Sequence, residues 1–104
     1  MNINKDKQKK VCGTIEDAEF LIGLGNGRNT NYKLIGKEVT LTLNRDSNTL
    51  IHSFGGAFNG EWDVHWSSPT RIYLSMEERW GDNIFNAGCI QYSVVVVLAE
   101  SLAE

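Results

Sequence analysis

The feature that most constrains this 104-residue sequence is the run at residues 90–98, Ile-Gln-Tyr-Ser-Val-Val-Val-Val-Leu. It is the most apolar stretch of the chain, and its four consecutive valines disfavour a helix because branching at Cβ restricts χ1 there. The same branching suits the pleated surface of a strand. We therefore predict a central β-strand, and the unbroken apolar run predicts a strand that is buried on both faces or one that crosses from one core to another.

Several other segments alternate apolar and polar residues with the period of two that half-buried strands show. These segments are residues 39–43, 50–54, 62–66 and 72–76. Turns rich in glycine and asparagine separate them at a spacing of about 12 residues, which predicts a mainly β antiparallel sandwich, open barrel or strongly bent sheet of about five or more strands. We expect a long polar loop at residues 77–88. The chain length predicts one globular domain over residues 11–104.

Residues 11–25 allow two interpretations. In the first, Thr14 caps a short helix whose apolar face recurs at helical spacing, and Gly25 ends it, which would make the fold α+β. That face comprises Ile15, Ala18, Leu21 and Ile22. In the second, residues 10–15 and 19–22 are strands flanking a turn at Glu16 and Asp17. We favour the helix, because acidic residues in its first turn complement the helix dipole.

The charge is distributed unevenly along the chain. Residues 1–10 carry a balance of +3 and the remainder a balance of −6, which gives the net charge of −3. We therefore expect a flexible basic leader followed by an acidic body. An acidic body repels phosphate backbones, which argues against direct nucleic-acid binding, and it favours basic protein partners.

The sequence predicts a cytoplasmic protein. No apolar stretch follows the basic leader as a signal peptide requires, and no run approaches the roughly 20 apolar residues of a membrane span. In the cytoplasm Cys12 and Cys89 are expected to be reduced thiols. Each lies beside glycine and near apolar residues, which predicts small buried side chains rather than a disulfide.

No catalytic or cofactor motif is convincing, so we expect a non-enzyme without a cofactor. The three glycines at residues 23–27 are followed by polar loop and strand, whereas a phosphate-binding loop needs a helix N-terminus after it. Pairing Cys89 with His65 as nucleophile and base is disfavoured because burial raises the pKa of a thiol. The acidic residues near position 77 do not suffice for glycoside chemistry, which needs a deep cleft.

A metal site is the weakest of the candidates. His52 and His65 are the only imidazoles, and they lie on segments that we predict to be neighbouring strands. Together with Asp63 they supply three donor side chains of the types that bind zinc. Since no helical HxxxH or CxxC spacing accompanies them, we predict no metal.

The strongest functional signal is a mixture of aromatic and acidic residues at positions 58–85. Aromatic side chains anchor protein interfaces and charges steer association, so this region predicts a binding surface for a basic partner. The predicted contact residues are Glu61, Asp63, Tyr73, Glu77, Glu78, Trp80 and Asp82. Trp62 and Trp66 share the face of Val64 and are expected in the core instead.

These features predict a small, acidic, non-catalytic binding protein. It would neutralise a basic protein by occlusion, as immunity proteins, antitoxins and phage-encoded inhibitors of host defence do, with a nuclease toxin or a nucleic-acid-binding enzyme as target. A structural or assembly subunit of a phage or secretion particle, which would form homo-oligomers, is the alternative. A small-ligand-binding β-barrel is more distant.

Overall fold

The computed structural model describes residues 8–22, 28–81 and 88–101, and within them every regular element is a strand. All strand pairs are antiparallel and belong to one sheet of order β2-β1-β7-β6-β5-β4, with β3 also pairing with β1. The mainly β prediction is therefore confirmed. The strands are β1 Lys9–Ile22, β2 Arg28–Thr30, β3 Glu38–Leu43, β4 Thr49–Ser53, β5 Asn59–Ser68, β6 Arg71–Trp80 and β7 Gly88–Leu98.

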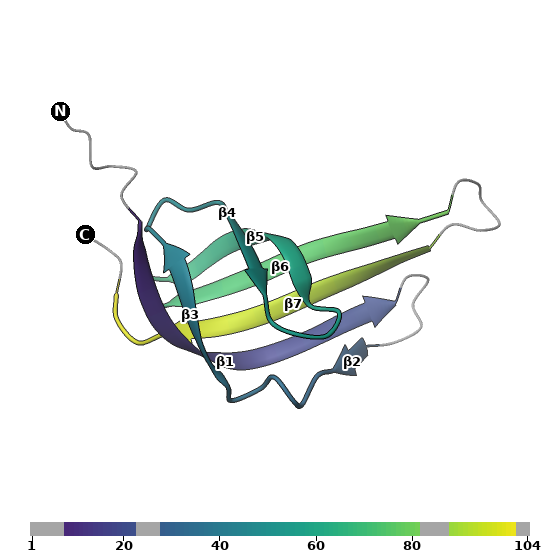
Figure 1. Cartoon of the computed structure of the whole chain (residues 1–104), viewed down its shortest axis with the longest axis horizontal. Helices are drawn as coiled ribbons and strands as arrows, with labels where there is room; N and C mark the ends of the chain where they lie inside the picture. The colour runs from purple at the N-terminus through teal and green to yellow at the C-terminus, as the bar shows by residue number, and fades with distance from the viewer. Residues whose placement is uncertain (1–7, 23–27, 82–87, 102–104) are drawn as a thin grey trace.

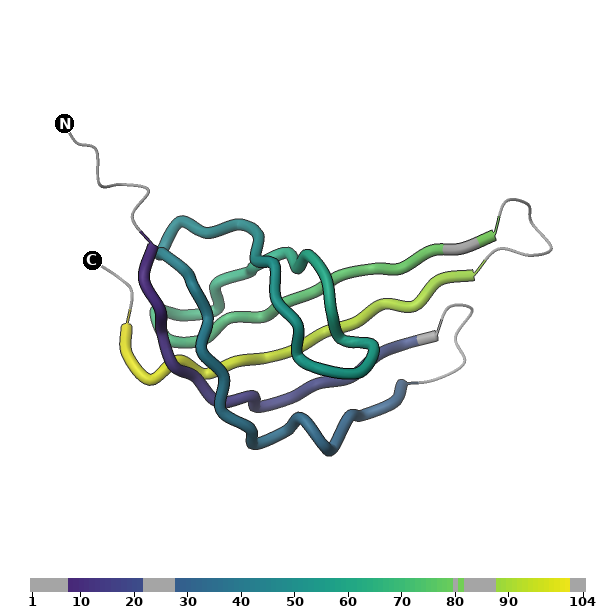
Figure 2. Tube along the Cα trace, in the orientation of Figure 1, coloured from purple at the N-terminus to yellow at the C-terminus, as the bar shows by residue number. Residues whose placement is uncertain are grey.

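The sheet bends round into an open barrel. Strand β1 pairs with β7 along one edge and with β3 and β2 along the other. Figure 1 shows β3 and β4 passing in front of β5, β6 and β7, and the Cα trace in Figure 2 follows the same path. In the described part of the chain, β3 and β4 touch without forming a ladder, so the barrel is open between them. The far ends of β1, β6 and β7 extend beyond this double layer.

The predicted N-terminal helix is wrong, because residues 9–22 form the single strand β1. The register of β1 against β7 shifts between Ile15 and Asp17, which leaves Glu16 as the extra residue of a β-bulge. Before the bulge Val11 and Ile15 point into the core, and after it Ala18 does. A bulge between two segments of period two thus produces the three-residue spacing that imitates a helix face.

The valine run is the central strand β7, as predicted, but only one of its faces is buried. Val94 and Val96 are completely buried, whereas Val95 is half-buried and Val97 is 38% exposed. The other face lies on the side of the sheet that no described element covers. The prediction of burial on both faces is therefore wrong.

The core lies between the bent sheet and the strands that cross it. Trp62 is completely buried, and its ring stacks on Phe58 with centroids 6.5 Å apart. Trp66 is half-buried against the same cluster, so both residues lie on the core side of β5 as predicted. Since these side chains fill the interior, one continuous core supports a single domain.

Three local predictions also need correction. Strand β6 continues to Trp80, so the predicted loop is wrong for residues 77–80, while residues 82–87 lie outside the described part. Lys9 and Lys10 of the predicted leader belong to β1, and residues 1–7 are not described. Cys12 and Cys89 are free thiols, but the first is exposed and the second half-buried, because both lie on the side of their strands away from the core.

Candidate functional site

The sheet has a second face that does not contribute to the core, and we call it the outer face. It consists of the alternate residues of β1, β2, β5, β6 and β7 whose side chains point away from the core. Its members are Glu16, Asp17, Glu19, Leu21, Arg28, Glu61, Asp63, His65, Arg71, Tyr73, Ser75, Glu77, Arg79, Gln91, Ser93, Val95 and Val97.

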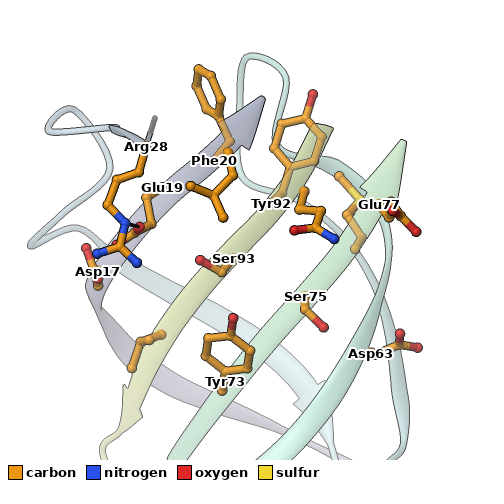
Figure 3. A pocket seen from close by; sticks show the side chains of 14 residues that line it. Asp17, Glu19, Phe20, Arg28, Asp63, Tyr73, Ser75, Glu77, Tyr92 and Ser93 are labelled. Atoms are coloured by element: carbon orange, nitrogen blue, oxygen red, sulfur yellow. Dashed lines mark ion pairs between the residues drawn. The ribbon is translucent and has the colours of Figure 1, made fainter. Parts of the chain in front are cut away.

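The outer face carries an open groove of about 640 Å³, and Phe20, Met76 and Tyr92, whose side chains belong to or pack against the core, also line it. Asp17 and Glu19 of β1, with Arg28 of β2, line one side of this groove, and Asp63 of β5 and Glu77 of β6 line the other (Figure 3). The groove therefore brings together four carboxylates and one guanidinium from strands far apart in sequence. A cleft lined mainly by one sign of charge concentrates the opposite charge within it.

Between the two acidic sides lie neutral polar groups. Tyr73, Ser75 and Ser93 occupy the middle of the groove, and Gln91 and Val95 also line it. Tyr73 is 42% exposed, and its ring centroid lies 6.0 Å from that of His65 on β5. An exposed tyrosine beside hydroxyl groups provides both apolar contact area and hydrogen bonds to a bound chain.

The carboxylates of the groove differ in how well they are neutralised. Glu19 is only 15% exposed at its side chain, and its Oε1 lies 2.7 Å from Nε of Arg28. Burial raises the pKa of the Glu19 carboxyl above its ordinary value of 4.5, a hydrogen bond with Asp17 raises it further, and Arg28 opposes both effects. Asp63 and the neighbouring Glu61 have no cationic partner in the described part of the chain, so their charges are available to a ligand.

Four of the predicted contact residues come together on the outer face. Glu61, Asp63, Tyr73 and Glu77 lie on the adjacent strands β5 and β6, all pointing away from the core. Glu77 is also 3.0 Å from the guanidinium of Arg79 on the same strand. These four residues form one continuous surface, and their contact with a partner stays a prediction.

Glu78, a further predicted contact, does not belong to this surface. Glu78 lies on the opposite face of β6 because adjacent residues of a strand point to opposite sides, and it accepts a 2.9 Å hydrogen bond from Tyr92 Oη. The Glu78 side chain is exposed on that side of the strand, and its contact with a partner stays a prediction. The side chain of Trp80 and the whole of Asp82 lie outside the described part of the chain.

Sequence reasoning missed one side of the groove. Asp17, Glu19 and Arg28 belong to segments that we expected to be helix and loop, so they were not considered as partners of the β5 and β6 carboxylates. The signal that could have identified the two carboxylates is the alternation of Asp17 and Glu19 with the apolar residues Ala18 and Phe20, which fits a strand.

The three candidate metal ligands do not converge. His52 lies on the core side of β4, where its ring is 4.5 Å from that of Phe54, whereas His65 and Asp63 lie on the outer face. Burial lowers the pKa of His52 below its ordinary value of 6.5. Among residues 8–22, 28–81 and 88–101, no group of three or more histidine, cysteine, aspartate and glutamate side chains is placed to hold a metal ion.

Comparisons of this chain with protein-family models, curated proteins and solved structures find no match. The described residues also contain no helix with the length and apolar character needed to cross a membrane. Any functional conclusion therefore depends on the geometry and charge of the sites themselves.

Proposed function

We propose that this protein is a small non-catalytic inhibitor that neutralises a basic protein partner in the cytoplasm by covering its cationic surface, in the manner of an immunity protein, an antitoxin or a phage-encoded inhibitor of host defence. The observation that supports this proposal is the outer-face groove, where carboxylates from β1, β5 and β6 surround an exposed tyrosine. A nuclease toxin or another nucleic-acid-binding enzyme presents the complementary surface of lysine and arginine residues.

The charges of the groove suit both the approach and the docking of such a partner. Glu61 and Asp63, which have no cationic partner in the described residues, attract the partner and increase its association rate. Tyr73 then provides a rigid contact in the centre, where aromatic side chains contribute most to affinity. The serine hydroxyls in the middle of the groove are placed to accept hydrogen bonds from the partner's cationic side chains.

The proposal is tested by capturing the partner from a lysate of the source organism at low and at high salt. We expect one basic protein to bind the wild type stoichiometrically and to be released as salt screens the charges. The double variant Glu61→Lys, Asp63→Lys should lose this partner. The matched control Glu38→Lys, Glu100→Lys changes the net charge equally but lies outside both the groove and the outer face, and it should retain the partner. Equal loss in both variants contradicts the proposed site.

An assembly subunit remains the second candidate because of strand β4. Ile51 is 80% exposed on this strand, which has a ladder on only one side in the described part of the chain. An edge strand with an exposed apolar side chain favours pairing with another chain. Size-exclusion chromatography with light scattering separates the two candidates: concentration-dependent homo-oligomers that dissociate in Ile51→Lys support assembly, and a monomer supports the inhibitor.

A further inference from the structure

A second pocket lies at one end of the barrel, away from the outer-face groove. Two connections meet there: the turn between β3 and β4, and the end of β5 with its turn into β6 (Figure 2). The pocket has a volume of about 320 Å³ and is lined by Arg45, Trp66, Ser67, Ser68 and Pro69. This volume is at the lower end of the range for small-molecule sites, roughly 300–1,000 Å³.

The indole of Trp66 is held in a fixed position within this pocket. Its Nε1 donates a 3.2 Å hydrogen bond to the carbonyl oxygen of Ser47, which ties the two turns together. Ser47 is itself buried, and its Oγ accepts a 2.9 Å hydrogen bond from the backbone nitrogen of Asn44. Because Trp66 also packs against the core, a ligand meets an aromatic surface that needs no reorganisation on binding.

The charge of the pocket is opposite to that of the protein as a whole. Arg45 is the one ionisable residue in the lining, so the lining contains a cation and no carboxylate. The neighbouring Asp46 reaches Arg45 Nε only at 3.9 Å, and both side chains are more than half exposed, so the guanidinium stays largely free to bind another anion. Ser67 and Ser68 add hydroxyl groups at the rim.

We propose that this pocket binds a small planar anion, with its ring stacked on Trp66 and its carboxylate or phosphate facing Arg45. An indole favours flat ligands, and a guanidinium pairs with carboxylate and phosphate through two parallel hydrogen bonds. Neither group alone defines this ligand class, but their combination in one pocket selects a molecule that carries both a ring and a negative charge. This function is independent of the outer-face groove.

The experiment follows the indole N–H signal of Trp66 by NMR during titration of the full chain. Two probes carry the proposed chemistry: 4-hydroxybenzoate supplies a carboxylate and adenosine monophosphate a phosphate. Acetate, inorganic phosphate and neutral benzamide each lack one of the two features. We expect saturable shifts with at least one planar anion and about tenfold or more weaker binding of the three incomplete probes. Benzamide loses the charge-assisted hydrogen bonds to Arg45, and acetate and inorganic phosphate lose the ring stacking on Trp66. The planar anion that binds more tightly shows whether the pocket prefers a carboxylate or a phosphate.

Charge variants test the role of Arg45 without disturbing the core. Arg45→Gln should weaken binding about tenfold or more, and Asp46→Asn should strengthen it about twofold because it removes the carboxylate that is paired with Arg45. The control Arg79→Gln removes another exposed arginine, which lies on the outer face, and should leave the affinity unchanged. No saturable shift with either planar anion, equal binding of benzamide, or unchanged affinity in Arg45→Gln overturns the proposal.

Discussion

Deletion of Glu16 tests the role of the β-bulge in β1. Without this residue β1 has one uninterrupted period of two, so one half of the strand must turn its side chains over. Turning the first half exposes Val11 and Ile15, each 1% exposed at present. The loss of about 1.5–3 kcal/mol for each side chain gives about 3–6 kcal/mol in total. Turning the second half is costlier, because it drives the Asp17 and Glu19 carboxylates into the core.

The assay is urea denaturation followed by tryptophan fluorescence, with Glu16→Ala as the matched control. The control keeps the bulge and removes only the ion pair between Glu16 and Arg71, whose side chains are 46% and 50% exposed. Such an exposed pair contributes about 0–1 kcal/mol. Since small domains have about 5–15 kcal/mol of total stability, the deletion variant should unfold at a far lower urea concentration or fail to fold. A deletion variant within about 1 kcal/mol of Glu16→Ala refutes the bulge explanation.

Three further predictions concern stability. The variant Gly13→Ala should lower the free energy of unfolding by about 1–3 kcal/mol in chemical denaturation, because the added Cβ would lie 2.7 Å from Cγ1 of Val96. An unchanged denaturation midpoint would show that β1 and β7 move apart at no cost. Burial lowers the pKa of His52 below 6.5. The wild-type protein should therefore lose stability as the pH falls from 6.5 to the lowered pKa, because in this range the unfolded chain binds a proton at His52 that the folded chain does not. His52→Phe should flatten that part of the pH profile, and an identical slope would contradict it. Asn59→Ala removes the acceptor of a 2.6 Å hydrogen bond from Ser53 Oγ and should lower thermal stability by about 0.5–1.5 kcal/mol, whereas Ser53→Ala should cost no more.

The sequence was sufficient to predict the strands that keep a single period of two. Residues 39–43, 50–53, 62–66 and 72–76 fall in strands as predicted, because their alternation reports directly which side of the sheet is buried. Strand β1 was not recognisable in the same way. Its bulge changes which residues face the core, so the buried residues Ile15 and Ala18 are three positions apart, as on a helix. Only the pairing with strand β7 shows that a bulge, and not a helical turn, causes this spacing.

The residues of the site could be predicted from the sequence only where the boundaries of the strands were predicted correctly. Glu77 and Glu78 seemed equivalent within a predicted loop, but in β6 they point to opposite faces, and only Glu77 reaches the groove. The carboxylates of β1 joined the site through the pairing of β1 with β7, which is a contact between the two ends of the sequence. Such pairings depend on the whole topology, and no local pattern in one sequence reports them.

The separation of the outer face from the core affects how this protein can evolve. Residues such as Asp63, Tyr73 and Glu77 point away from the buried cluster, so substitutions there have little effect on folding, and under the proposed function they change recognition. A lineage in which the partner's surface keeps changing can therefore alter specificity one residue at a time on an unchanged scaffold. The same property makes the groove a suitable position for randomised libraries, in which many variants should remain folded and differ mainly in the target they select.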